Sequence, residues 1–418
     1  MRAHLLLLIS ILVFAPLVYG QETHYDESRV PNYTLPDPLA FEDGRSVETA
    51  ADWPERRAEI LRLFEQQVYG ITPDLGLTPR AEILRSRDDA FDGLASQHQL
   101  RLHLTDSLHI DLLLYVPNQR DHPAATFVAL NFYGNASVSD DPQILLTDAW
   151  MRANDDYGIV NHRATEATRG VRARRWPMEH IVRRGYAVAT AYCGDLDPDY
   201  DDGFENGVHA IAPPADSSGW ATLGAWAWGL SRIGDYLTTR TDLDPHRMMV
   251  MGHSRLGKAA LWAGAQDERF AAVISNNSGA GGAALSRRGF GETVARINTS
   301  FPHWFSSAFT RYNDHEAALP VDQHQLIALM APRPIYIASA EEDLWADPKG
   351  EFLSALGADP VYRLLGTEGL EATTLPPLET PLLSRIGYHI RRGKHDVMRY
   401  DWDRFMDFAD LHLKPIEE

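Results

Sequence analysis

The spacing of hydrophobic residues changes near residue 125 of the chain. Before that point, residues 53–69 carry apolar side chains at helical spacing, which predicts an amphipathic helix. Residues 101–116 alternate apolar and polar positions around a short polar turn, which is the pattern of an antiparallel hairpin. The rest of residues 21–95 begins with several prolines and looks like an extended lead-in.

After residue 125, short apolar runs alternate with stretches of helical spacing. Parallel strands need crossover connections and are buried on both faces, so this alternation predicts an α/β fold with a mainly parallel central sheet sandwiched between helices. No repeat or long linker divides the chain, which favours a single domain over residues 21–418. The predicted strands are 125–132, 186–192, 248–251, 271–275, 334–340 and 386–390, and the predicted helices are 219–238, 259–265 and 402–413.

The first twenty residues differ in composition from the rest. Arg2 gives a positively charged start, residues 5–18 are almost wholly apolar, and Gly20 precedes the polar Gln21. The apolar run is short for a transmembrane helix and has the form of a secretory signal. We therefore expect a signal peptide over residues 1–20, no membrane attachment after its cleavage, and a secreted or periplasmic protein. An uncleaved membrane anchor is the alternative.

Composition and charge narrow the range of partners. The 418 residues include 58 acidic and 39 basic side chains, for a formal net charge of −19. Nucleic acids and anionic membrane surfaces attract clustered positive charge, so this balance argues against both as partners. Cys193 is the only cysteine, which excludes an internal disulfide and a thiolate zinc site. We expect no cofactor, no bound metal and a monomer.

One acidic loop resembles a calcium-binding loop. Residues 195–203 contain repeated aspartates, but counting from Asp197 the sixth position is Asp202 rather than glycine, and the twelfth is Val208 rather than glutamate. Those two positions shape an EF-hand loop, so the sequence excludes that motif. Because the loop follows the predicted strand 186–192, we expect it to border the edge of the sheet that carries the active site.

The run from residue 250 to residue 260, VMGHSRLGKAA, has the layout of a nucleophile elbow. A predicted strand leads into Gly252, Ser254 follows, and a helix begins at once. In the α/β-hydrolase fold, such a strained turn lifts a serine hydroxyl above the edge of the sheet. Leu256 replaces the second glycine of the usual GxSxG, and Gly257 comes one residue later. A helix N-cap is the alternative role for this serine.

A serine nucleophile needs a base and an orienting acid, which in this fold follow in the order Ser, acid, His. His395 lies between the last predicted strand and the C-terminal helix, where the base is expected. The acid is expected on the loop after the strand that ends at residue 340. Spacing alone does not choose among the four carboxylates of that loop, which are Glu341, Glu342, Asp343 and Asp347.

Four segments carry a family resemblance: GHSRLGKAALWAGA, SNNSGAGGAALSRR, EEDLWADPKGEF and RRGKHDV. Together they resemble the bacterial glucuronoyl esterases of carbohydrate esterase family 15, over roughly residues 125–413. The resemblance implies an α/β-hydrolase fold and a serine esterase. It also implies a substrate, the ester that joins 4-O-methyl-glucuronic acid of glucuronoxylan to lignin alcohols.

The resemblance also implies roles for individual residues. It makes Ser254 the nucleophile, His395 the base, Asp343 the acid and Arg255 an oxyanion stabiliser. The positions at which the family contacts the hydroxyls and ring of the uronic acid are held by Lys258, Glu292 and Trp345. Fungal members place the acid in a QESGAGG-like segment, where Asn277 stands here. An amide cannot serve as that acid, and this departure favours the loop after residue 340.

Each of these side chains also has an ordinary structural role open to it. Arg255 could belong to a surface ion pair, Lys258 could be solvated, and Trp345 could pack in the core. In the functional interpretation, the backbone N–H and the guanidinium of Arg255 both stabilise the oxyanion that forms in the reaction. The backbone N–H can do so because N–H groups at the start of a helix have no partner within the helix.

Three functions from different classes remain open. The first is a glucuronoyl esterase, the second is another serine carboxylesterase such as an acetyl xylan esterase, or a peptidase, and the third is an inactive carbohydrate-binding homologue. The presence of Ser254, His395 and Asp343 counts against the third. A simple acetylesterase has no uronic acid ring to hold, so Arg255, Lys258 and Trp345 count against the second.

Overall fold

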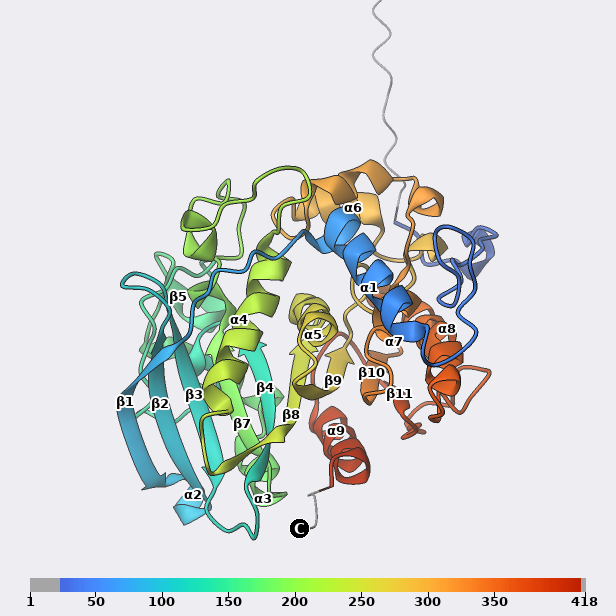
Figure 1. Cartoon of the computed structure of the whole chain (residues 1–418). Helices are drawn as coiled ribbons and strands as arrows, with labels where there is room; N and C mark the ends of the chain where they lie inside the picture. The colour runs from blue at the N-terminus through green and yellow to red at the C-terminus, as the bar shows by residue number, and fades with distance from the viewer. Residues whose placement is uncertain (1–22, 415–418) are drawn as a thin grey trace, which may run out of the picture.

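A nine-stranded sheet runs through the structure, a computed structural model that describes residues 23–414 (Figure 1). The predicted signal peptide over residues 1–20 lies outside this range. The strands span Arg80–Asp89 (β1), Ala95–His103 (β2), His109–Pro117 (β3), Ala124–Asn131 (β4), Ile159–Val160 (β5), Arg163–Ala164 (β6), Ala187–Tyr192 (β7), Leu243–His253 (β8), Phe270–Asn276 (β9), Ile335–Ala340 (β10) and Ile386–Arg391 (β11).

The order of strands in the main sheet is β1-β2-β3-β7-β4-β8-β9-β10-β11, and β5 and β6 form a separate two-stranded sheet. Neighbours from β1 to β7 pair antiparallel. All neighbours from β7 to β11 pair parallel. The prediction of a mainly parallel sheet is therefore confirmed, with an antiparallel extension at the β1 side.

Helices cover both faces of the sheet (Figure 1). The helices α1, α4, α5, α7 and α8 contribute to one hydrophobic cluster, and α2, α3 and α9 contribute to the other. None of the helices within residues 23–414 has the length and apolar character needed to span a bilayer. The helices span Trp53–Phe64 (α1), Ala90–Gly93 (α2), Met178–Arg183 (α3), Thr222–Leu237 (α4), Arg255–Gln266 (α5), Val294–Ser300 (α6), Gln323–Ala328 (α7), Pro348–Leu364 (α8) and Arg399–His412 (α9).

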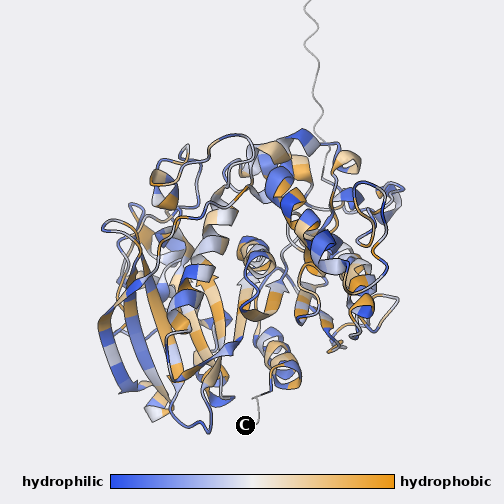
Figure 2. Cartoon of the chain, in the orientation of Figure 1, coloured by the Kyte–Doolittle hydropathy of each residue, from blue (hydrophilic) through white to orange (hydrophobic). Residues whose placement is uncertain are grey.

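The central strands divide their side chains between the two clusters. In β4, Val128 and Leu130 belong to the cluster under α4 and α5, whereas Phe127 and Ala129 belong to the cluster under α3 and α9. Successive side chains of a strand point to opposite faces, so a strand covered on both sides must be apolar at every position. This accounts for the mostly hydrophobic colour of the central strands in Figure 2.

Some elements carry no clear hydrophobic pattern and were not predicted. Strand β1 lies in the predicted lead-in, yet it pairs with β2 and extends the sheet. None of its ten residues is buried, and its pairing with β2 shifts register between Ile83 and Arg85. A solvent-facing edge strand needs no alternation of apolar residues, so periodicity does not reveal it. Helix α8, which contains Pro360, was also missed.

Strand β8 and helix α5 cross at very close range. A Cβ atom built on Gly252 would lie 2.0 Å from the carbonyl oxygen of Leu256 in the first turn of α5. A Cβ on Gly257 would lie 3.1 Å from the Gly252 carbonyl oxygen. The side chain of Leu256 instead enters the hydrophobic core, where it is buried. The departure from GxSxG therefore keeps glycine at the two positions that face the crossing.

We predict that Gly252→Ala lowers the melting temperature by several degrees, because the added methyl group forces β8 and α5 apart. Overpacking of this kind costs about 1–3 kcal/mol or more. The matched control is Gly234→Ala in α4, where the nearest atom to a new Cβ is 3.7 Å away. Helix propensity favours alanine there by up to about 1 kcal/mol. Equal melting temperatures for the two variants would contradict the tight crossing.

Candidate active site

The carboxyl ends of the parallel strands meet at one edge of the sheet and carry the candidate catalytic residues. Ser254 follows β8, Asn277 follows β9, Asp343 follows β10 and His395 follows β11. A cleft of about 410 Å³ opens at this edge. Every residue to which the family resemblance gives a role lines this cleft, together with two aromatic residues that were not predicted, whereas Glu341, Glu342 and Asp347 do not line it. The lining includes Ser254, Arg255, Lys258, Asn277, Glu292, Phe301, Trp304, Asp343, Trp345 and His395.

Ser254 occupies the strained position of the elbow. Its φ of 58° and ψ of −132° lie where residues with a side chain are rarely found. Its backbone N–H donates to the carbonyl oxygen of Asn276 at 2.9 Å, and its carbonyl oxygen accepts from Gly257 at 2.8 Å. Strain of this kind persists only where surrounding contacts enforce it, as the β8–α5 crossing does here.

Asp343 is the acid of the β10 loop that contacts the histidine. Its Oδ2 atom lies 2.6 Å from Nδ1 of His395, and the carboxylate is buried. Asp347 instead pairs with Arg288 and caps α8, while Glu342 is exposed. A hydrogen bond from Nδ1–H to the carboxylate leaves Nε2 of His395 without a proton, which is the form a general base needs.

Asn277 supports the same carboxylate. Its Nδ2 donates to Oδ2 of Asp343 at 2.8 Å, so this oxygen binds both the amide and the histidine. Asn277 has a φ of 48°, and its backbone N–H donates to the carbonyl oxygen of Ala338 in β10. Asn277, on the loop after β9, therefore donates a hydrogen bond to the carboxylate on the loop after β10.

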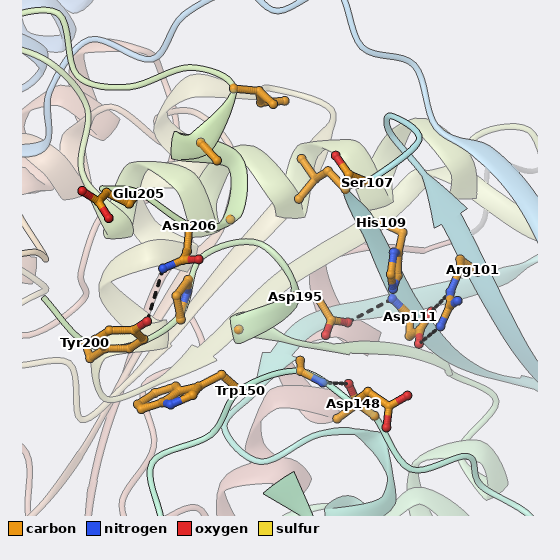
Figure 3. Close-up of a pocket in the computed structure, with 18 residues that line it drawn as sticks. Arg101, Ser107, His109, Asp111, Asp148, Trp150, Asp195, Tyr200, Glu205 and Asn206 are labelled. Atoms are coloured by element: carbon orange, nitrogen blue, oxygen red, sulfur yellow. Dashed lines mark hydrogen bonds and ion pairs between the residues drawn. The ribbon is translucent and has the colours of Figure 1, made fainter. Parts of the chain in front are cut away.

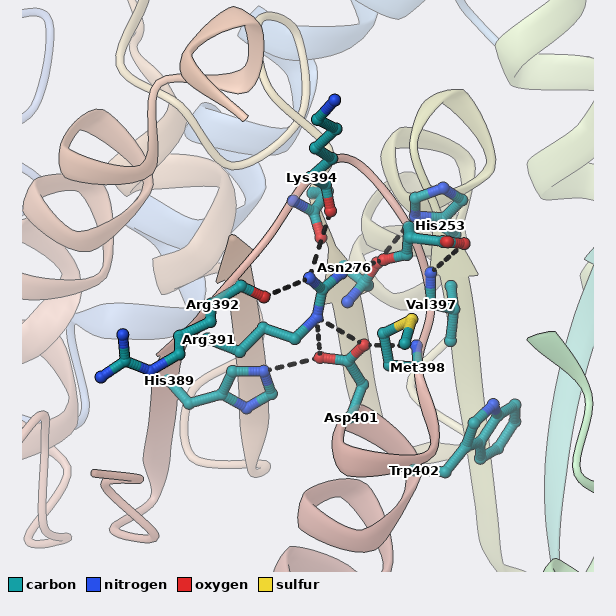
Figure 4. Close-up of polar contacts among 12 residues, drawn as sticks. His253, Asn276, His389, Arg391, Arg392, Lys394, Val397, Met398, Asp401 and Trp402 are labelled. Carbon is teal, nitrogen blue, oxygen red and sulfur yellow. Dashed lines mark hydrogen bonds and ion pairs between the residues drawn. The ribbon is translucent and has the colours of Figure 1, made fainter. Parts of the chain in front are cut away.

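Arg391 fixes the loop that carries His395 (Figure 4). Its guanidinium donates to the carbonyl oxygens of Lys394 at 3.1 Å and Asp396 at 2.6 Å, the two residues that flank His395. Its Nε donates to Asp401 at 2.9 Å, and both members of this ion pair are buried. His395 therefore lies on a loop whose backbone is held by a buried arginine.

The ring of His395 also packs against His253, the residue before Ser254. The two ring centroids are 4.5 Å apart, at an angle of 39°. Nδ1 of His253 lies 2.7 Å from Oδ1 of Asn276. Burial, followed by the charge of His395, holds the pKa of His253 well below its usual range. A neutral ring at this position lets His395 gain a proton without facing a second positive charge.

The guanidinium of Arg255 is held at the cleft by Asp199. Its Nε lies 2.7 Å from the carboxylate, and its Cζ lies 4.5 Å from the centre of the Phe132 ring. Asp199 also accepts hydrogen bonds from His303 and Trp304, at 3.0 and 2.8 Å. Burial opposes the charge of Asp199, but Arg255 and these hydrogen bonds outweigh it and hold its pKa below the usual range.

Lys258 and Glu292 form a buried ion pair in the cleft. Nζ of Lys258 lies 3.2 Å from Oε2 of Glu292 and donates to the carbonyl oxygen of Ala280 at 2.6 Å. An ammonium group has three donors, so one remains for a ligand. The backbone N–H of Glu292 donates to the carbonyl oxygen of Trp345, whose side chain is half-buried. Lys258 is thus not a solvated side chain.

Asp199, Trp304 and Arg391 were missed from the sequence. The acidic loop of residues 195–203 was expected to border the active-site edge, but nothing in its spacing singled out Asp199. Arg391 contacts the base loop only through backbone carbonyl groups, which leave no sequence signature. Within residues 23–414, no group of three or more histidine, cysteine, aspartate or glutamate side chains is arranged to hold a metal ion.

The comparisons with known proteins identify the family of this chain. Residues 215–366 match a family described as glucuronyl esterase of fungi. The chain is 50% identical over 409 residues to the carbohydrate esterase MZ0003 from an unknown prokaryotic organism, covering 95% of this chain and 94% of that one. A solved promiscuous CE15 esterase from a marine bacterial metagenome has 50% identity and a TM-score of 0.89, covering 94% of this chain and all of the other. The chain belongs to carbohydrate esterase family 15.

A second solved member of the family, the glucuronoyl esterase from Solibacter usitatus, shows the same relationship. It is 42% identical and has a TM-score of 0.88, and the match covers 93% of this chain and all of the other. The family resemblance and the α/β-hydrolase fold predicted from the sequence are therefore confirmed, and the protein is a carboxylic ester hydrolase. The roles of the individual site residues stay predictions.

We predict that Asp343→Ala lowers kcat/KM on an ester by about 10²- to 10⁴-fold, because His395 loses the partner that sets its tautomer. Asn277→Ala removes one hydrogen bond to the carboxylate, worth about 1 kcal/mol, and should cost no more than about tenfold. Steady-state kinetics on the same ester measures both. Near-normal turnover by Asp343→Ala would assign the acid to Glu341, Glu342 or Asp347.

The pKa of His253 predicts how stability depends on pH. Between its lowered pKa in the fold and about 6.5 in the unfolded chain, only the unfolded state binds the proton, so wild-type stability falls as the pH drops below about 6.5. The loss is up to about 1.4 kcal/mol per pH unit for this group. The His253→Gln variant lacks this titrating group, so it does not lose stability at low pH for this reason.

Urea unfolding of wild type and His253→Gln at pH 7.5 and pH 5.5 tests this. We expect the variant to gain stability relative to wild type at the lower pH. A difference that does not change with pH would show that His253 is not kept neutral by the fold.

Proposed function

We propose that the protein hydrolyses the ester between the carboxyl group of 4-O-methyl-glucuronic acid, carried on glucuronoxylan, and lignin alcohols. The observation that carries this proposal is the buried Lys258–Glu292 pair in the same cleft as Ser254 and Trp345. Uronic acid hydroxyls can bind both members of such a pair, whereas an acetyl group offers it nothing. The relative from Solibacter usitatus, a glucuronoyl esterase, supports the same assignment.

Acylation begins when the hydroxyl oxygen of Ser254 attacks the ester carbonyl carbon and Nε2 of His395 takes the hydroxyl proton. Asp343, bound to Nδ1 of His395, stabilises the resulting imidazolium. The bond to the alcohol oxygen then breaks, and the alcohol leaves with the proton from His395. The glucuronoyl group remains as an ester on Ser254.

Deacylation repeats these steps with water. His395 takes a proton from the water as it attacks the acyl carbon, and then returns a proton to the oxygen of Ser254. The free uronic acid is released, and the enzyme returns to its starting state. No other reactant is required.

The negative oxygen that forms in both steps needs fixed donors. The backbone N–H of Arg255 stands at the first position of α5, where helical donors have no partner within the helix. The guanidinium of the same residue lines the cleft and is held by Asp199. A single donor aimed at such an oxygen is worth about 3 kcal/mol, because it is oriented before the reaction begins.

We assign recognition of the uronic acid to other residues that line the cleft. The remaining donor of Lys258 and the Oε1 atom of Glu292 can bind ring hydroxyls, and the indole of Trp345 can cover the apolar face of the sugar. Binding energy from these remote groups orients the carbonyl against Ser254, so it raises kcat as well as lowering KM. A polymer substrate lies outside the cell, and the signal-like residues 1–20 support export of the enzyme.

A broader carboxylesterase is the second candidate. The solved relative that shares 50% identity is described as promiscuous, which favours a wider range of esters for that protein. The two candidates differ in what the ring-binding residues contribute, because a small acetate ester uses only the triad and the oxyanion donors.

We predict that Trp345→Ala and Lys258→Met each lower kcat/KM on a benzyl glucuronate ester by about tenfold to several hundredfold, or about 1.5–3 kcal/mol. Hydrolysis of para-nitrophenyl acetate should barely change. Ser254→Ala should abolish both activities without unfolding the protein. Thermal melts of each variant show whether the loss of a buried ion-pair partner has also damaged the fold.

Equal losses on the two substrates would show that Trp345 and Lys258 only support the fold. A wild-type preference for the acetate would overturn the glucuronoyl assignment and leave the broader carboxylesterase.

A further inference from the structure

The structure contains a second cavity, separate from the catalytic cleft (Figure 3). Its volume is about 520 Å³, within the range of natural ligand sites, and it shares no lining residue with the cleft. Its walls come from the turn between β2 and β3, from residues 147–150 and from residues 194–211. None of the steps proposed for ester hydrolysis uses these residues.

One segment of chain lies between the second cavity and the catalytic cleft. Pro198 and Tyr200 line the second cavity, while Asp199, between them, holds the guanidinium of Arg255 in the cleft. Neighbouring Cα atoms in a chain are about 3.8 Å apart, so the cavity wall and the support of Arg255 are almost the same piece of backbone. A ligand in the cavity would therefore lie beside the catalytic cleft and against the segment that positions Arg255.

One end of the cavity is aromatic (Figure 3). The rings of Trp150 and Tyr200 have centroids 4.2 Å apart, and Trp150 is stacked on His162 at 5.2 Å. Asn206 donates to the hydroxyl of Tyr200 at 3.2 Å. These contacts hold the two rings in place before any ligand arrives, so binding costs little side-chain entropy. Rings of this kind suit the C–H surface of a sugar.

The remainder of the cavity is polar and acidic. Asp148 and Glu205 make no hydrogen bond within the described part of the chain, so their oxygens are available. Arg101 is already occupied by two hydrogen bonds to Asp111, at 2.7 and 2.8 Å. Burial, followed by the charge of Asp111, raises the pKa of Asp195 to about 8, which makes Asp195 a possible donor at neutral pH.

This chemistry selects among ligand classes. Free carboxylate oxygens accept hydrogen bonds from hydroxyl groups, and their charge repels a second carboxylate such as that of a uronic acid. A flat aromatic alcohol would find few apolar walls beyond the two rings. A metal ion is disfavoured, because no suitable group of ligating side chains occurs within residues 23–414. A neutral polyhydroxyl ligand fits the lining best.

We propose that this cavity binds neutral sugar units of the polysaccharide that carries the ester. The proposal rests on the proposed function, since that function supplies a chain of neutral sugars attached to the uronic acid in the cleft. Sugar units in the cavity pack against residues 198–200 and so restrict the motion of the Asp199–Arg255 ion pair. Esters on an oligosaccharide chain therefore react faster than the same ester on a single uronic acid.

Calorimetric titration of the Ser254→Ala protein with xylotetraose, which contains neither uronic acid nor ester, tests the site directly. We expect binding that becomes about tenfold or more weaker when Tyr200→Ala or Asp148→Ala is added. The matched control is Tyr25→Ala, which removes an exposed tyrosine that lines neither hollow and should bind as before. Thermal melts confirm that each variant is folded.

Kinetics gives the second readout. Tyr200→Ala should lower kcat/KM on a xylo-oligosaccharide carrying the ester at least about tenfold more than on benzyl glucuronate. Absence of xylotetraose binding at millimolar concentrations would overturn the proposal. Binding that Trp345→Ala removes and Tyr200→Ala leaves intact would also overturn it, because the sugar would then lie in the cleft. If xylotetraose binds here but benzyl glucuronate is not hydrolysed, the proposed function fails and the sugar site stands.

Discussion

The close crossing of β8 and α5 at Gly252 determines where the reactive groups lie. Because no side chain fits between the strand and the Leu256 carbonyl oxygen, the chain must turn sharply at Ser254, and the serine takes a φ of 58°. The same turn starts α5, so the Arg255 N–H is unpaired at the edge of the cleft and Lys258 follows one helical turn later. It also leaves His253 beside His395. One steric constraint thus places Ser254, the N–H of Arg255 and Lys258 together.

Charged groups around the cleft are held in buried or half-buried pairs. Asp199 holds Arg255, Glu292 holds Lys258, and Asp401 holds Arg391. Such pairs add little net stability, because desolvation offsets most of their attraction. Their value lies in orientation, since a transition state is stabilised by groups that need no rearrangement when charge develops. Arg255, Lys258 and the loop that carries His395 are therefore each fixed by a charged partner.

The sequence reveals those parts of the molecule that obey local rules. Strands buried on both faces are continuous apolar runs, and β4, β7 and β10 were found in this way within one or two residues. The elbow at Ser254 and the order of its partners placed His395 and restricted the acid to one loop. The choice of Asp343 among four carboxylates came from family resemblance, and the structure adds its contact with His395.

The parts that escaped prediction depend on contacts between distant residues. Asp199 and Arg391 act through partners that only the folded chain brings near, and Asn277 looked like a lost acid before its hydrogen bond to Asp343 was visible. Strand β1 escaped for the opposite reason, because it buries nothing and so leaves no periodic signal.

The polar character of β1 bears on how the sheet ends. An uncovered edge strand offers unpaired backbone groups on which another chain can build, the first step of aggregation. Here the edge carries Arg80, Glu82, Arg85 and Arg87, and its register shift interrupts a regular ladder. At the opposite edge, residues 379–382 lie along β11, and the N–H groups of Glu379 and Leu382 donate to the carbonyl oxygens of Ile390 and Tyr388 at 2.8 Å. The β1 edge is charged and irregular, and the β11 edge is covered by residues 379–382. Neither edge therefore favours pairing with a strand of a second molecule.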